Sequence, residues 1–223
     1  MTTILQKGLA VRSLTAAFGL FLYSFGLYLT IQASIGVAPW EVLALGIAER
    51  TGFLYGNIAL TTSIILLLID LLMKEKLGIG SILDALICGK AVDLFNWLEL
   101  VPQQTDTLRG ILMLVAGLFI MAFGQWIYML VGLGCGPRDA FLVAVGKWLH
   151  RLPIGVVQNG ILLVVLAAGW LLGGPVGIGT LISVVGMGTT MQLVFRLVRF
   201  EPRDVVHQGL MESIKNIVKG TEE

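Results

Sequence analysis

Two short segments place a carboxylate behind a glycine and a proline. The first is IGVAPWE (35–41) and the second is LGCGPRD (133–139), so the same spacing recurs ninety-eight positions later. Proline suits the first position of a helix, and the exposed N–H groups of a helix start favour a carboxylate in its first turn. Glycine tolerates the backbone angles of a sharp break. We therefore predict that each segment interrupts a helix and begins a short new one.

The residues at these two breakpoints are candidates for binding a solute. In many secondary transporters, interrupted helices meet near the membrane midplane and bind a solute or a coupling ion with their ends. Trp40, Glu41, Arg138 and Asp139 occupy such positions. The alternative is that Glu41 and Asp139 only cap helix ends at the membrane interface. Because Arg138 stands where the first copy has Trp40, the two breakpoints differ chemically.

A second candidate site lies in the apolar stretch 79–100. Lys90 and Asp93 are three residues apart, so they share one face of a helix and can pair. Ionisable groups inside a membrane span are costly and mark functional sites, although a purely structural ion pair is the alternative. Asp84 lies in the same stretch, about half a turn from Asp93. The position that matches Asp93 in the second copy is Gln192, which is polar but uncharged.

Residues for other kinds of chemistry are sparse. His150 and His207 have no neighbours of the kind that form a nucleophile triad or a zinc site. Cys88 and Cys135 lack metal-ligand spacing and are interpreted as small apolar residues. The chain has no basic stripe and no phosphate-binding loop of the form G-x-x-x-x-G-K followed by Ser or Thr. We therefore expect no enzymatic activity, no metal, no cofactor and no nucleic acid partner.

The composition is that of a membrane protein. Hydrophobic residues make up 57% of the 223 residues and charged residues 13%, against about 25% charged in an average soluble domain. A helix that spans a bilayer needs about 20 apolar residues. Six stretches are long enough, of which the third and the sixth carry polar groups: 13–36, 53–73, 79–100, 110–134, 154–173 and 176–198.

These stretches form two copies of one pattern, 8–100 and 107–198. The first span of each copy has two glycines seven residues apart, and LGIGSI (77–82) in the first copy matches VGIGTL (176–181) in the second. Spacing by seven puts the glycines on one helix face, where they let two helices approach closely. We interpret these glycines as packing residues.

The segments that follow the breakpoints, 39–50 and 137–151, are too short to cross a bilayer at about 1.5 Å per residue. They are expected to be re-entrant or interfacial half-helices. The alternative is that they cross fully, which would make the two repeats parallel. As half-helices they leave each copy with three crossings, so the second copy enters the membrane with the opposite orientation. We predict an all-α integral membrane fold of six transmembrane helices in two inverted three-helix repeats.

Charge at the ends of the spans predicts the orientation. With the N-terminus inside, twelve lysines and arginines are cytoplasmic and two are outside, in accord with the positive-inside rule. The tail 201–223 has apolar residues at helical spacing. It is predicted to be a C-terminal amphipathic helix on the inner membrane surface, with both termini of the chain cytoplasmic.

The doubled breakpoint, the PWE of the first copy and the GIGS and GIGT motifs together resemble a known group, the YczE/YyaS/YitT family of bacterial inner-membrane proteins. The resemblance covers nearly the whole membrane part. It implies a multi-pass protein of the bacterial cytoplasmic (inner) membrane, for which a transport role is the common suggestion.

The sequence favours a transporter or channel for a small polar or anionic solute, bound near the midplane between the inverted repeats. Asn57, Gln125, Gln158 and Asn159 could line its pathway or form hydrogen bonds between helices. The alternative is a non-catalytic membrane docking or substrate-capture subunit of a larger complex. The lipid bilayer and a small-molecule solute are the expected partners, and the sequence leaves open a homo-oligomer or a partner subunit.

Overall fold

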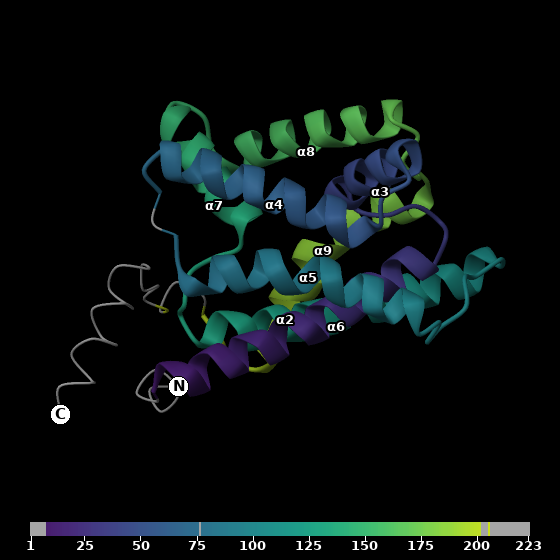
Figure 1. Cartoon of the computed structure of the whole chain (residues 1–223), viewed down its shortest axis with the longest axis horizontal. Helices are drawn as coiled ribbons and strands as arrows, with labels where there is room; N and C mark the ends of the chain where they lie inside the picture. Colours follow the sequence, from purple (N-terminus) through teal and green to yellow (C-terminus); the bar gives the residue numbers. More distant parts are fainter. Residues whose placement is uncertain (1–7, 76, 202–204, 206–223) are drawn as a thin grey trace.

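The computed structural model describes residues 8–75, 77–201 and 205, which form a bundle of helices (Figure 1). This part of the chain contains eight helices and no strands. Their bounds are α2 Leu9–Gln32, α3 Pro39–Thr51, α4 Tyr55–Leu72, α5 Ile79–Trp97, α6 Thr107–Leu130, α7 Pro137–Trp148, α8 Ile154–Leu171 and α9 Ile178–Leu197. The amphipathic helix predicted for the tail 201–223 lies outside the described residues, apart from Glu201 and Val205.

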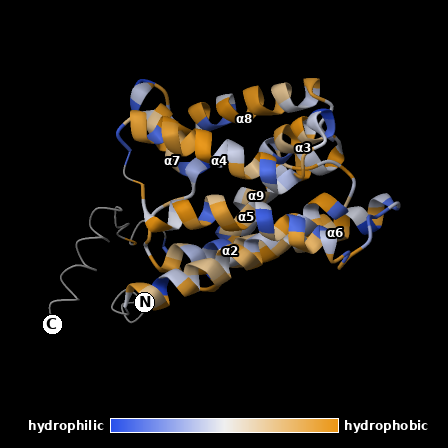
Figure 2. Ribbon diagram, viewed as in Figure 1, coloured by the Kyte–Doolittle hydropathy of each residue, from blue (hydrophilic) through white to orange (hydrophobic). Residues whose placement is uncertain are grey.

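Five helices are long and apolar enough to cross a membrane: α2, α4, α6, α8 and α9. α5 has a similar length, 19 residues, but carries Asp84, Lys90 and Asp93. Figure 2 shows apolar residues covering the long helices, and large apolar side chains such as Leu72 and Leu163 are exposed on the outside. The chain is therefore a multi-pass membrane protein, and five of the six predicted spans meet the criteria of length and composition.

The first span of the first half (8–100) packs against the first span of the second half (107–198) through glycines. α2 crosses α6 with Gly19 beside Gly124 and Gly26 beside Gly117, so the two helices run antiparallel. A Cβ added at Gly26 would lie 2.6 Å from the carbonyl oxygen of Gly117, closer than any side chain tolerates. The seven-residue glycine spacing is a packing feature, as predicted.

Each breakpoint begins a short helix at its proline. α3 starts at Pro39 and has 13 residues, and α7 starts at Pro137 and has 12. Gly36 and Gly134, just before them, have φ angles of 102° and 112°, which favour glycine. Both predicted interruptions are present, and both short helices begin at the predicted residue.

The GIGS motif of the first half holds the breakpoint of the second half, and the GIGT motif of the second half holds the breakpoint of the first. The Gly80 N–H donates to the carbonyl oxygen of Leu133 at 2.8 Å, and the Gly179 N–H donates to that of Ile35 at 2.7 Å. The short helices also pack across the halves, α3 on α8 and α7 on α4. The two halves are thus tied together at two matching joints.

The halves differ in how their last two spans pack. In the first half, α4 lies against α5, and a Cβ added at Gly89 would lie 2.9 Å from the carbonyl oxygen of Gly56. The matching glycines of the second half are Gly155 and Gly188, and no described residue lies within 4 Å of a Cβ added at either. Within the described chain, α8 does not pack along α9 as α4 packs along α5. The second half is therefore open where the first half is closed.

Candidate functional site

An ion pair joins the starts of α3 and α7. A guanidinium nitrogen of Arg138 donates to a carboxylate oxygen of Glu41 at 2.6 Å. Glu41 is only 3% exposed, so its charge depends on Arg138 for compensation. The guanidinium of Arg138 also lies over the ring of Trp40, 5.3 Å from the ring centre, which is a cation–π contact. The structure therefore brings three of the four predicted breakpoint residues into direct contact.

A cavity of about 460 Å³ lies beside this ion pair. All four breakpoint residues line it: Trp40, Glu41, Arg138 and Asp139. Other walls come from α8 and α9, the helices that leave the second half open. They supply Gln158, Asn159, Ile161, Leu162, Ser183, Val184, Met187, Gly188 and Met191. Cavities of about 300–1,000 Å³ with a few polar groups are typical of sites for small molecules.

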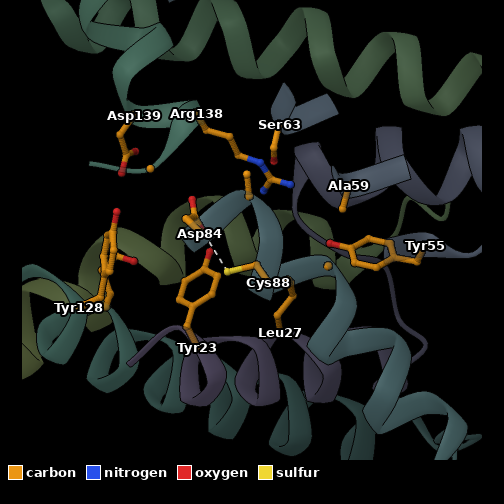
Figure 3. Close-up of a pocket in the computed structure, with 14 residues that line it drawn as sticks. Tyr23, Leu27, Tyr55, Ala59, Ser63, Asp84, Cys88, Tyr128, Arg138 and Asp139 are labelled. Carbon is orange, nitrogen blue, oxygen red and sulfur yellow. Dashed lines mark hydrogen bonds between the residues drawn. The ribbon is translucent and has the colours of Figure 1, made fainter. Parts of the chain in front are cut away.

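A smaller cavity of about 90 Å³ shares part of its lining with the larger one, including Arg138 and Asp139. Figure 3 shows the side chains that converge on it, among them Tyr23 of α2, Tyr55 of α4 and Asp84 of α5. The site is therefore built from helices of both halves, and the start of α7 contributes to both cavities.

Two carboxylates of the smaller cavity lie close to each other. A Cβ built at Gly136 would lie 2.6 Å from Asp84 Oδ2 and 3.9 Å from Asp139 Oδ2. The other oxygen of Asp84 accepts a hydrogen bond from the Cys88 thiol at 2.8 Å. Asp139 is exposed to the cavity and makes no hydrogen bond or ion pair with another described residue. Its carboxylate lines both cavities.

Two buried hydroxyl groups at the cavities have no hydrogen-bond partner among the described residues. Tyr128 is 2% exposed and lines the smaller cavity, where its hydroxyl points toward Asp139 (Figure 3). Ser183 is also 2% exposed and lines the larger cavity. Leaving such a group unpaired costs about 1–3 kcal/mol. A polar molecule that pairs with these hydroxyls would recover that free energy.

The other predicted site residues lie elsewhere, and none of them lines either cavity. Lys90 Nζ is 4.0 Å from Asp93 Oδ2, so the two residues form the predicted pair, although the side chain of Lys90 is 47% exposed. Lys90 also donates to the side-chain oxygen of Asn57, and Asp93 accepts the N–H of Gly56 at 2.8 Å. Gln192 is exposed on α9. Lys90 and Asp93 therefore hold α4 against α5.

Sequence reasoning did not select several polar residues of the site. Tyr23, Tyr55, Tyr128 and Ser183 give no signal, because a single tyrosine or serine in an apolar helix equally suits interfaces and helix packing. Asp84 carries a usable signal, since a carboxylate inside a membrane span is costly. Among the amides, Gln125, Gln158 and Asn159 line the larger cavity, whereas Asn57 binds Lys90.

Comparison with known proteins identifies the family of this chain. A family of unknown function, DUF6198, matches residues 10–196, so the chain belongs to that family. An uncharacterized protein of Haemophilus influenzae is 29% identical over 81% of this chain and 82% of its own length. In Bacillus subtilis, the uncharacterized membrane protein YczE is 26% identical (78% of this chain, 80% of its own length) and the uncharacterized protein YyaS is 28% identical (74% and 83%). The resemblance to YczE and YyaS is therefore confirmed, and no solved structure matches the chain significantly.

Proposed function

We propose that this member of the DUF6198 family is a membrane transporter that moves a small polar solute through the site where its two breakpoints meet. The observation that carries the proposal is the cavity of about 460 Å³ beside the Glu41–Arg138 pair, lined by both halves of the chain. Sites of this kind, between the ends of interrupted helices, bind solutes and coupling ions in secondary transporters.

An inverted relation between the halves supports this function. α2 and α6 are matching spans and run antiparallel. The two joints between breakpoint and glycine motif are matching contacts made in reciprocal directions. α3 and α7 lie toward opposite ends of α4 (Figure 1). Two inverted repeats with α5 as the sixth span account for all three observations.

A protein with two inverted repeats can adopt a second state in which its halves exchange their helix packing. In that state α8 would pack on α9 through Gly155 and Gly188, and α4 would part from α5 at Gly56 and Gly89. Each half would then adopt the packing that the other half has now. The cavity would change its access from one side of the membrane to the other, as alternating access requires.

The proposed location is the bacterial cytoplasmic membrane, with both termini cytoplasmic. The charge distribution supports this orientation. Cysteine at Gln103, an exposed residue before α6, should react with an impermeant reagent added outside intact cells. Cysteine at exposed Arg151 should react only after the membrane is opened. Labelling of both positions from the outside would contradict the six-span topology.

Uptake into liposomes tests the transport function. Liposomes with the purified protein are incubated with a mixture of small polar metabolites, washed, and analysed by mass spectrometry. We expect at least one solute to accumulate relative to protein-free liposomes, and Asp139→Asn to reduce its accumulation. Glu49→Gln changes an exposed acid of α3 and serves as the matched control. Folded protein that accumulates nothing would contradict the proposal.

A pair of cysteines tests the second state. In a protein with Cys88→Ser and Cys135→Ser, the pair Gly155→Cys and Gly188→Cys should form a disulfide under oxidation. Nothing described lies within 4 Å of either position now, so the bond requires α8 and α9 to come together. We expect oxidation to stop uptake and reduction to restore it, with each single cysteine variant insensitive. No disulfide in a protein that transports would contradict the exchange of packing.

The alternative function, a docking or substrate-capture subunit, draws less support from the structure. A small-residue face of α2 left open for a partner would favour it, but that face packs on α6. Uptake by the purified protein alone would separate the two functions, because a capture subunit needs another chain to move its solute.

A further inference from the structure

The charged groups that line the two cavities are out of balance. Glu41, Asp84 and Asp139 are acidic, whereas Arg138 is the one cation among the described lining residues. Arg138 already forms an ion pair with Glu41 at 2.6 Å. The described lining residues offer Asp84 and Asp139 no cation besides Arg138, in an interior where an isolated charge is costly.

The starts of the two half-helices do not cancel this excess. A helix N-terminus acts as about half a positive charge. Glu41 lies in the first turn of α3 and Asp139 in the first turn of α7, so each start already faces a carboxylate. With Arg138, the two starts offer about two positive charges against three carboxylates. With all three carboxylates ionised, about one negative charge remains, which favours a monovalent cation and disfavours an anion.

The groups around this charge are mainly hydrogen-bond acceptors. Asp84 and Asp139 approach the same point at Gly136, 2.6 Å and 3.9 Å from a Cβ built there. The buried Tyr128 hydroxyl has no hydrogen-bond partner among the described residues and points toward Asp139 (Figure 3). A hydroxyl can accept as well as donate, and a primary ammonium group has three donors and no acceptor. One ammonium group could therefore pair with all three side chains.

The larger cavity offers an apolar surface beside this position. Met121, Leu142, Ile161, Val184 and Met187 line it. Side chains of this kind bind the hydrocarbon part of a ligand, and methionine adapts to varied shapes. The described residues contain no group of three or more His, Cys, Asp and Glu placed to hold a metal ion. The site is better suited to an organic cation than to a metal ion.

We infer that the solute is a small organic cation, with an ammonium group held by Asp84, Asp139 and Tyr128 and an apolar body in the larger cavity. This inference rests on the proposed transport function and deepens it. It selects a cationic solute in place of the anionic one that the sequence allowed.

Three probes with a shared apolar body and different charges test the inference. They are 2-phenylethylamine, which is an ammonium ion at pH 7, the neutral 2-phenylethanol, and the anionic 3-phenylpropionate. Binding to the purified full-length protein in detergent is measured by calorimetry. We expect the amine to bind about ten- to a hundredfold more tightly than the alcohol, the effect of a hydrogen bond to a charged group. The carboxylate should bind most weakly.

A variant tests whether the preference for the amine over the alcohol arises at Asp84. Asp84→Asn should remove the advantage of the amine and leave the affinity for the alcohol within about twofold. Glu49→Gln, an exposed acid outside both cavities, should change neither affinity. If Asp84→Asn does not fold, Asp139→Asn replaces it, because the Asp139 side chain has no partner among the described residues to lose.

The outcomes separate this inference from the transport function. Equal affinities for the three probes, preference for the carboxylate, or no binding of any probe would overturn the organic-cation site. Amine binding without uptake into liposomes would overturn transport and leave the site standing. Uptake of a solute that both Asp84→Asn and Asp139→Asn leave unchanged would support transport and overturn the cation site.

Discussion

The two halves of the molecule carry the same glycines and use them differently. Gly56 and Gly89 let α4 and α5 touch, whereas Gly155 and Gly188 face open space in the described structure. Glycine inside a helix costs about 0.5–1 kcal/mol relative to alanine. Neither Gly155 nor Gly188 packs against another described helix, so packing in this state does not account for them. The exchange of packing proposed above supplies a reason, since these two would become contacts in the second state.

Polar side chains on α5 explain why the first half is the closed one. Asp93 accepts the N–H of Gly56 at 2.8 Å, and Lys90 donates to Asn57. Two side chains of α5 thus hold the first turn of α4. At the position of α9 that matches Asp93, Gln192 is exposed. The difference teaches that charges conspicuous in a membrane span can act as a clamp between helices rather than as a binding site.

The largest effect is expected at the carboxylates of the two breakpoints, because Glu41 is ion-paired and Asp139, within the described chain, is not. Arg138→Met leaves Glu41, which is 3% exposed, without its partner, and breaking a buried ion pair costs about 3–5 kcal/mol. Asp139→Asn removes a carboxylate that makes no hydrogen bond or ion pair with another described residue. The free energy of unfolding of this variant should therefore stay within about 1 kcal/mol of that of the parent protein. Unfolding in detergent measures both. Equal losses would mean that breaking the Glu41–Arg138 pair costs no more than removing the Asp139 charge.

The next difference concerns the glycines. Gly56→Leu forces a side chain into the contact between α4 and α5 and should cost about 1–3 kcal/mol, as overpacking does. Gly155→Leu enters open space and should fold as well as the parent. It should still slow uptake, because it would keep α8 from closing on α9. A Gly155→Leu protein as unstable as Gly56→Leu would contradict the open second half.

A smaller effect is expected at Asp93 and its counterpart. Asp93→Ala removes the acceptor of the Gly56 N–H and should cost about 0.5–2 kcal/mol, as the loss of a helix cap does. Gln192→Ala, at the matching position of α9, should stay within about 0.5 kcal/mol. Chemical denaturation of the two variants compares them directly. A larger loss at Gln192 would assign it a contact that the structure does not contain.

The smallest effect is expected at Lys90. Its side chain is 47% exposed, and its nitrogen is 4.0 Å from Asp93, so Lys90→Met should cost about 0–1 kcal/mol. Uptake should persist, because Lys90 lines neither cavity. Abolished uptake in a stable Lys90→Met protein would restore this residue as a solute site.

The architecture was largely predictable from the sequence. Spans, breakpoints and the glycine face of the first spans depend on local composition and spacing, which the sequence states directly. Pro39 and Pro137 marked the starts of the short helices to the residue. These features follow from single segments and do not depend on which helices meet.

The site was only partly predictable, because it depends on contacts between distant segments. Nothing in the spacing of Glu41 and Arg138 indicates that they touch across the two halves. The identical glycine patterns gave no sign that α4 closes on α5 while α8 stays away from α9. Tyr128 looked like any aromatic residue of an apolar span, and only the fold places its hydroxyl beside Asp139.

The reciprocal hydrogen bonds between breakpoints and glycine motifs also determine the order in which the helices assemble during synthesis. The carbonyl of Ile35 bonds to Gly179, which is made near the end of the membrane part. Ribosomes add about 5–20 residues per second, so the first breakpoint waits on the order of ten seconds for its partner. Until then its backbone groups need water or a temporary partner, because buried peptide groups must be paired. The first half can enter the membrane early, but its short helix reaches its final place only when the last span has left the ribosome.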